Sequence, residues 1–139
     1  MLFPKKVKHR KWQKKRLNPL KAPVATRGVR VSFGSHGLKA LNYARVRSNQ
    51  IEAARRVISR SMGKTGKVWV RIFPDRPYTQ KAAEVGMGKG KGDVQGYEVE
   101  ILPGRIMFEV DGVSDVAAFE ALRKAGAKLP LSTKVVVRV

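Results

Sequence analysis

The sequence of 139 residues predicts an α+β fold, an antiparallel sheet sandwich with two helices. Three observations favour this class. Short segments alternate apolar and polar residues, which is typical of half-buried strands. Two segments place apolar residues at helical spacing. Strands and helices mix without a βαβ repeat, and turns between neighbouring strands imply antiparallel pairing. We expect a basic N-terminal arm over residues 1–28 and a single α+β domain over residues 29–139, with a long Gly/Lys-rich loop over residues 78–93.

The arm is expected to lack a long helix, because Pro4, Pro19 and Pro23 interrupt it. Its Lys and Arg residues recur without an apolar period, which is typical of a segment that orders on a charged partner. Trp12 is the exception in this run. It is either a hydrophobic anchor on the domain or a platform on which a base stacks.

The domain is expected to begin with a hairpin. VRVSF (29–33) alternates apolar and polar residues, GSHG (34–37) reads as a turn, and LKAL (38–41) predicts the second strand.

The clearest helix is predicted over residues 48–63. Asn49 and Glu52 have the spacing of a capping box, and Gly63 is placed to end the helix. Its apolar residues form one stripe that should face the core: Ile51, Ala54, Val57, Ile58 and Met62. The arginines outside this stripe outnumber the one acid of the helix, so a phosphate partner is expected for Arg56 and Arg60.

A strand is predicted over KVWVRIF (67–73), with Val68, Val70 and Ile72 on one face. PDRP (74–77) should stop this strand, because two prolines bracket a turn.

The second half predicts another hairpin, a helix and a last strand. GYEVEIL (96–102) and RIMFEV (105–110) flank a Pro-Gly turn, a helix begins at Ser114 and continues to about Gly126, and STKVVVRV (132–139) reads as the last strand. The helix residues expected to face inward are Val116, Phe119 and Leu122.

Positive charge is concentrated in the first two-thirds of the chain. The chain has 30 Lys and Arg, 10 Asp and Glu, and a net charge of +20. Residues 1–92 hold 24 basic and three acidic residues, whereas residues 93–139 hold six and seven. Self-repulsion on this scale disfavours a compact state unless a polyanion neutralises it. The composition therefore predicts a nucleic-acid partner.

Other functional classes are disfavoured. There is no cysteine for a disulfide or a Cys-based zinc site, and His9 and His36 are isolated, so no metal is expected. No apolar run approaches the roughly 18 residues of a membrane span, and no secretory signal pattern is expected. The acids Glu98, Glu100 and Glu109 have no associated His, Ser or Cys constellation, so no catalytic residue is expected, and Glu98 and Glu100 should line a wet face.

Two glycine-containing segments resemble nucleotide-binding loops in part, but neither matches a complete nucleotide-binding motif. Gly63-Lys64-Thr65 matches only the end of a Walker A motif, and the order is helix then strand instead of strand then helix. GMGKGKG (86–92) does not fit G-x-G-x-x-G, and a strand follows it. Its alternating glycines can instead let the backbone approach another surface, while Lys89 and Lys91 reach phosphates on both sides. No cofactor and no small-molecule substrate are expected.

Longer motifs carry a specific resemblance. They are MLFPKK at the start, SFGSHGLKAL (32–41), QIEAARR (50–56), GKVWVRIFPDRP (66–77), MGKGKG (87–92), PGRIMFEVDGV (103–113) and AGAKLPLSTK (125–134). In this order, over nearly the whole chain, they resemble the ribosomal large-subunit protein family L-sixteen, whose archaeal and eukaryotic relatives are called ten-e.

The resemblance implies a structural constituent of the large ribosomal subunit and not an enzyme, since RNA carries out peptidyl transfer. It implies binding to large-subunit rRNA near the peptidyl transferase centre and the A site. It also implies neighbouring ribosomal proteins and A-site tRNA as partners, and a role in subunit assembly and in the placement of A-site tRNA. The expected location is the cytoplasmic ribosome, with an organellar ribosome left open.

The family's contacts carry over to two groups of residues. The residues expected to bind rRNA are Lys5, Lys6, Lys8, Arg10, Lys11, Lys14, Lys15, Arg16, Arg55, Arg56, Arg60, Lys67 and Arg71. The residues expected to form the loop near the A site and its tRNA are Arg76, Lys81, Gly86, Met87, Gly88, Lys89, Gly90, Lys91 and Gly92.

The chain departs from the family pattern at two loop positions. Gly86 stands where many members carry an Arg that is hydroxylated in some bacteria, and Ala82 stands where members often have Pro. Two other functions remain as alternatives: a free-standing basic RNA-binding protein or chaperone, and a nucleotide-dependent enzyme.

Overall fold

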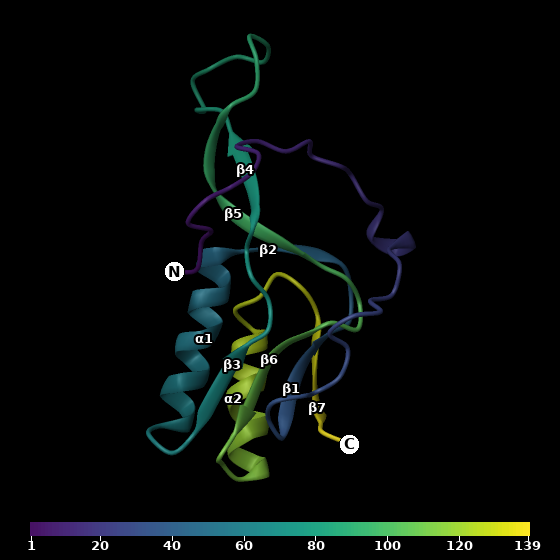
Figure 1. Ribbon diagram of the computed structural model, residues 1–139, viewed down its shortest axis with the longest axis vertical. Helices are drawn as coiled ribbons and strands as arrows, with labels where there is room; N and C mark the ends of the chain where they lie inside the picture. The colour runs from purple at the N-terminus through teal and green to yellow at the C-terminus, as the bar shows by residue number, and fades with distance from the viewer.

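The computed structural model describes all 139 residues and contains two antiparallel sheets and two α-helices (Figure 1), which confirms the α+β class. One sheet has four strands in the order β3-β6-β1-β7, and the other has three in the order β2-β5-β4. The strands are β1 (His36–Ala40), β2 (Ala44–Arg47), β3 (Lys67–Val70), β4 (Arg76–Gln80), β5 (Asp93–Ile101), β6 (Ile106–Asp111) and β7 (Thr133–Val137). The helices are α1 (Ser48–Met62), α2 (Asp115–Gly126) and a short 3-10 helix at Pro19–Lys21.

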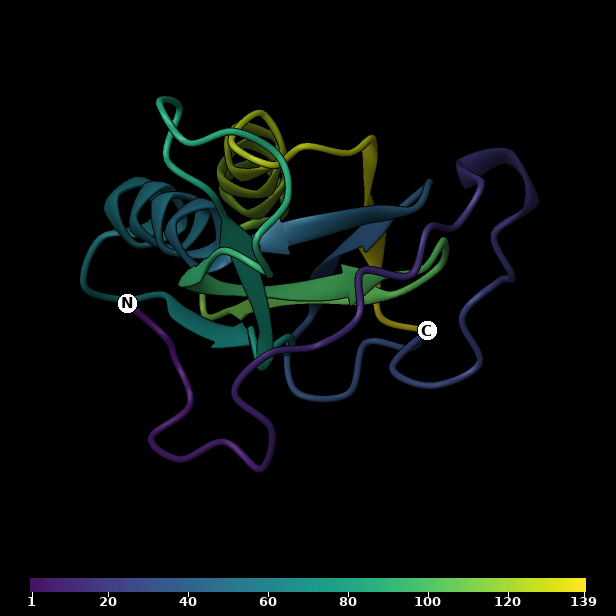
Figure 2. The ribbon, with the colours of Figure 1, turned by 90° about the horizontal axis from the view of Figure 1, so that it is seen from above.

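The main core lies where both helices pack together on one face of the four-stranded sheet (Figure 2). Phe108 of β6 and Leu38 of β1 are fully buried there. Burying a side chain of this size stabilises the fold by about 1.5–3 kcal/mol. No helix is both long enough and apolar enough to cross a membrane.

The helix α1 follows the predicted stripe closely. Four of the five stripe residues are buried, and Val57 is half-buried. Gly63 ends the helix with a φ of 70°, and its N–H donates to the Ser59 carbonyl at 3.1 Å. The predicted capping box is wrong: the helix starts at Ser48, and the N–H of Arg47 is bound by the side chain of Gln50 at 2.9 Å. Glu52 is thereby left to pair with arginines.

The predicted first hairpin is wrong. Residues 29–33 are not a strand, residues 36 and 37 belong to β1 instead of a turn, and β1 pairs with β6 and β7. The backbone N–H groups of residues 32–34 are directed to the carboxylate of Glu109, so they are not available for a strand ladder.

The region after β3 also differs from the prediction. The residues of the expected turn at 74–77 include the start of β4, and β5 begins at Asp93, so the connecting loop spans residues 81–92. The strand β2 was not predicted. Both β2 and β4 are stabilised by pairing with β5, which is distant in sequence.

The helix α2 buries smaller residues than predicted. Leu122 is buried as expected, but Val116 and Phe119 are 81% and 43% exposed. Three alanines face inward together with Leu122, because the helix lies close to α1 and to the sheet: Ala118, Ala121 and Ala125.

Candidate RNA-binding surface

The Gly/Lys-rich loop lies at the far end of a ribbon formed by β4 and β5 (Figure 1). Its tip is open, since Met87 is 97% exposed. Gly88 and Gly90 have φ values of 103° and 97°, and Lys89 between them has 60°. These are left-handed conformations, which glycine adopts without strain. The ammonium of Lys81 donates to the carbonyl of Gly88 and holds the tip towards β4.

Gly92 is needed where the loop returns to the sheet. A Cβ atom there would lie 2.8 Å from the backbone carbon of Gln80. Gly86, Gly88 and Gly90 have no atom within 4 Å of such a position. The glycines at the tip therefore leave open space around the backbone, which a partner surface can occupy.

The N-terminal arm reaches the base of the loop. The ammonium of Lys91 donates to the carbonyl of Trp12, and Lys11 donates to the carbonyl of Lys91 at 3.4 Å. Arg76 of β4 donates to the carbonyl of Gln13 at 2.8 Å. The arm and the loop therefore form one continuous surface at this end of the molecule.

Most cations of the arm have no carboxylate partner. Their side chains are exposed and none is within ion-pair distance of an acid. These exposed residues are Lys5, Lys6, Lys8, Arg10, Lys14, Lys15 and Arg16. Lys89 and Lys91 in the loop, and Arg60 and Lys67 in the body, are also exposed and unpaired. Their charge is available to an external anion.

Two cations of α1 share one carboxylate. Glu52 lies 2.5 Å from Arg55 Nη2 and 3.3 Å from Arg56 Nε. Hydrogen bonds from Arg55 lower the pKa of Glu52 to about 2. The same hydrogen bonding raises the pKa of Arg55. One carboxylate cannot neutralise two guanidinium groups, so this helix keeps positive charge on its exposed face.

Arg71, which was expected to bind rRNA, and Arg76, which was expected in the loop near the A site but lies at the start of β4, form ion pairs inside the domain. Arg76 has side-chain nitrogens 4.0 Å from Glu98 and 3.9 Å from Glu100. Glu98 is buried, so the expectation that it lines a wet face is wrong, whereas Glu100 is exposed as expected. Arg71 lies 2.9 Å from Oε2 of Glu109. Both arginines therefore hold the fold together near the surface.

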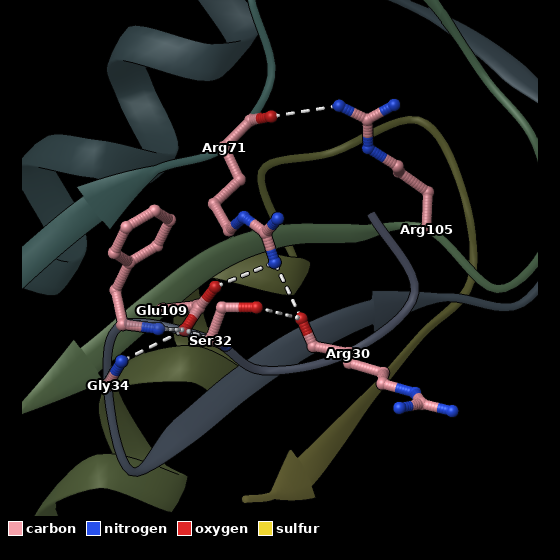
Figure 3. Close-up of polar contacts among 7 residues, drawn as sticks. Arg30, Ser32, Gly34, Arg71, Arg105 and Glu109 are labelled. Atoms are coloured by element: carbon pink, nitrogen blue, oxygen red, sulfur yellow. Dashed lines mark hydrogen bonds and ion pairs between the residues drawn. The ribbon is translucent and has the colours of Figure 1, made fainter. Parts of the chain in front are cut away.

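The Glu109 cluster was not predicted from sequence (Figure 3). Its Oε1 accepts the backbone N–H groups of Ser32, Phe33 and Gly34 at 2.9, 2.7 and 2.9 Å. Arg71 also donates to the carbonyl of Arg30 at 2.6 Å. The carboxylate thus fastens residues 30–34, which follow the arm and precede β1, to the four-stranded sheet. The available signal was an acid inside RIMFEV, a strand that is otherwise apolar.

The described groups include no cluster of three or more His, Cys, Asp or Glu residues that could hold a metal. The Gly63-Lys64-Thr65 segment joins the end of α1 to β3, so no helix follows it. The arrangement offers exposed cations, an exposed loop with glycines in left-handed conformations, and exposed aromatic rings. Such a surface suits contact with a polyanion.

Comparison with known proteins agrees with the resemblance. A family model described as ribosomal protein L16p/L10e matches residues 4–136. The large ribosomal subunit protein uL16 of Caulobacter vibrioides (strain NA1000 / CB15N) is 53% identical over 139 residues, covering 100% of this chain and 94% of the relative. That of Halorhodospira halophila (strain DSM 244 / SL1) is 53% identical over 138 residues, covering 99% and 98%. These relatives are ribosomal proteins and not enzymes, and the chain belongs to the ribosomal protein L16p/L10e family.

Proposed function

We propose that this chain is a structural constituent of the large ribosomal subunit that binds large-subunit rRNA near the peptidyl transferase centre and the A site. In this role it supports subunit assembly and the placement of A-site tRNA. Neighbouring ribosomal proteins are its other partners, and its location is the cytoplasmic ribosome. Residues 1–28 act as a basic arm, and residues 29–139 form the RNA-binding domain.

The joined arm and loop carry this proposal. Family membership supplies the ribosomal context. The exposed, unpaired cations of the arm lie beside a loop whose tip has open space around Gly86, Gly88 and Gly90. RNA phosphates would neutralise the cations and release condensed counterions. The loop would enter a narrow space because every second residue lacks a side chain.

Recognition would depend mainly on RNA shape and phosphate position, as is typical for packed A-form helices. Arg56 and Arg60 of α1 and Lys67 of β3 would add phosphate contacts from the body. Arg71 and Arg76 would act indirectly. Arg71 holds residues 30–34 beside β6 together with Glu109. Arg76 pairs with acids of β5 and donates to the Gln13 carbonyl of the arm. Lys89 and Lys91 would lie closest to the A site.

Sedimentation of ribosomes from cells that express a tagged chain tests this function. We expect one copy per large subunit after a moderate-salt wash, because many phosphate contacts are made at once. A free-standing RNA chaperone would instead be spread across fractions without a fixed ratio. Recovery of the chain only from the free cytosol would refute the proposal.

A further inference from the structure

A polar cleft lies between the arm and the three-stranded sheet, and it is bridged at its edge by the contacts of Lys91 with Trp12 and of Arg76 with Gln13. Its volume is about 290 Å³. Only two of its 12 lining residues are hydrophobic. Its charged residues are five cations and one acid: Lys14, Arg45, Arg47, Arg76, Lys91 and Glu98.

The cleft keeps an excess of positive charge after its internal ion pairs are formed. Glu98 lies 4.0 Å from Arg76. Arg45 lies 3.7 Å from Glu100, which is outside the cleft lining, and donates to the carbonyl of Lys15. Arg47 and Lys91 have no carboxylate within ion-pair distance. A concave site with cations of this kind attracts an anion.

Two aromatic rings in the cleft each have an Arg guanidinium group over one face, as in a cation–π contact. Arg76 lies 5.4 Å from the centroid of Trp12, and Arg47 lies 4.6 Å from that of Tyr78. Trp12 remains 41% exposed, so part of its ring is open to a ligand. Unpaired bases stack on aromatic rings and on Arg guanidinium planes. Trp12 therefore contacts Arg76 of the domain and keeps part of its surface exposed.

The strand β5 holds Tyr78 in position. A Cβ atom at Gly96 would lie 2.9 Å from Cε1 of Tyr78, so the ring occupies the space that the missing side chain leaves. Gly96 pairs with Tyr78 in the sheet. The aromatic and cationic groups of the cleft are thus positioned by the fold before any ligand binds.

We propose that this cleft binds one unpaired nucleotide of ribosomal RNA, with its base stacked on Trp12 and its phosphate held by Arg47 and Lys91. The size supports a single nucleotide, since small-molecule sites begin at roughly 300 Å³ and a duplex would not enter. The apolar lining is too small for a hydrophobic ligand. The inference rests on the proposed function, because rRNA is the partner that supplies the nucleotide.

Tryptophan fluorescence tests the stacking directly. The chain has two Trp residues, so Trp69→Phe leaves Trp12 as the sole reporter in the full-length protein. We expect bacterial large-subunit rRNA and a single-stranded oligoribonucleotide to quench Trp12 emission, and a fully paired duplex of the same sequence not to. Unchanged Trp12 emission in a sample where bound RNA is confirmed by gel shift would overturn the proposal.

Binding measurements with variants separate the base from the phosphate. Trp12→Ala should weaken binding of the single-stranded oligoribonucleotide by about 5- to 150-fold, the range for loss of one stacked base, with the salt slope unchanged. Arg47→Ala should reduce the salt slope by about 1, and Arg47→Lys should restore it.

Matched controls lie on α2. Phe119→Ala removes a ring that is 43% exposed, close to the value for Trp12, and Lys124→Ala removes an exposed cation. Neither should change affinity or slope, and thermal melting checks that each variant is folded. Wild-type affinity of Trp12→Ala would overturn the nucleotide site while leaving the proposed function intact. Failure of the wild-type chain to bind any rRNA would overturn both.

Discussion

At the scale of single residues, Glu109 connects the segment between the arm and β1 to the sheet through one carboxylate. It is fully buried and satisfies three backbone N–H groups and Arg71. Replacing it by an apolar residue would leave the three backbone N–H groups without this acceptor and the Arg71 guanidinium without its carboxylate, with only the carbonyl of Arg30 still accepting from it. Buried ion pairs contribute little net stability when intact, but removing one partner is expensive.

We expect Glu109→Leu to lower the free energy of unfolding by about 3–5 kcal/mol, the range for breaking a buried ion pair. Urea denaturation followed by circular dichroism measures the change. Glu84→Gln is the control, because Glu84 is exposed in the loop and forms no ion pair. It should stay within about 0.5 kcal/mol of wild type. A loss for Glu109→Leu no larger than that of the control would show that the carboxylate does not fasten residues 30–34 to the sheet.

Glu52 gives the fold a pH dependence with a defined sign. Its pKa in the folded chain is about 2, below its ordinary value of 4.5, because Arg55 donates hydrogen bonds to it. A lowered folded-state pKa stabilises the fold above the unfolded-state pKa, and this contribution is lost as the pH falls through the folded-state value.

The melting temperature of wild type should therefore exceed that of Glu52→Gln at pH 6, and the difference should shrink as the pH falls from about 4.5 towards 2. Melting curves of both proteins over this pH range measure it. Taking the difference between them removes the titration of the other carboxylates. A difference that is constant with pH would contradict the assigned ion pair.

At the scale of elements, the loop over residues 81–92 is expected to contribute to assembly and not to stability. Its side chains from 82 to 91 are exposed. Lys89→Ala with Lys91→Ala should change the free energy of unfolding by no more than about 0.5 kcal/mol per site. The same double variant should reduce the yield of mature large subunits, measured by sucrose-gradient profiles. A large loss of thermal stability with normal subunit yield would show that the loop belongs to the fold.

The glycines of the loop differ in whether their backbone conformation favours glycine. Gly88 has a φ of 103°, which a β-branched residue adopts only with strain, whereas Gly86 has no positive φ. Gly88→Val should therefore impair subunit maturation more than Gly86→Val, while both leave the melting temperature of the isolated chain nearly unchanged. Equal subunit yields for the two variants would contradict this role for the backbone conformation of Gly88.

Sequence patterns correctly predicted the elements that are determined by residues close together in the chain. The stripe from Ile51 to Met62 and the terminating Gly63 define α1 within one segment. By contrast, β2 and β4 depend on pairing with β5, and residues 29–33 are kept out of a sheet by Glu109, 75–77 residues away. Periodicity also placed Phe119 inside, but close packing of α2 selected alanines for that face.

The candidate RNA surface was predictable only in part. The excess of cations before residue 93 could be counted in the sequence. Which cations remain free could not, because the partners of Arg71 and Arg76 come from β5 and β6. The cleft beside Trp12 was likewise hidden, since it forms where the arm crosses a different part of the chain.

At the scale of the whole molecule, the distribution of charge and the arrangement of the arm and the loop both support RNA binding at one end of the molecule. The net charge is +20. The arm passes the β4–β5 ribbon close to the base of the loop (Figure 1), and most cations of both segments are exposed without a carboxylate partner. The cations of the arm and the loop repel one another, and too few acids lie nearby to neutralise them. Binding of RNA phosphates should therefore stabilise the chain. The central claim is that this end is enclosed in ribosomal RNA.

A cryo-electron microscopy map of the assembled large subunit containing this chain tests that claim most directly. We predict that residues 86–92 lie surrounded by rRNA, with phosphates beside Lys89 and Lys91. A map in which this loop faces open solvent would contradict the account.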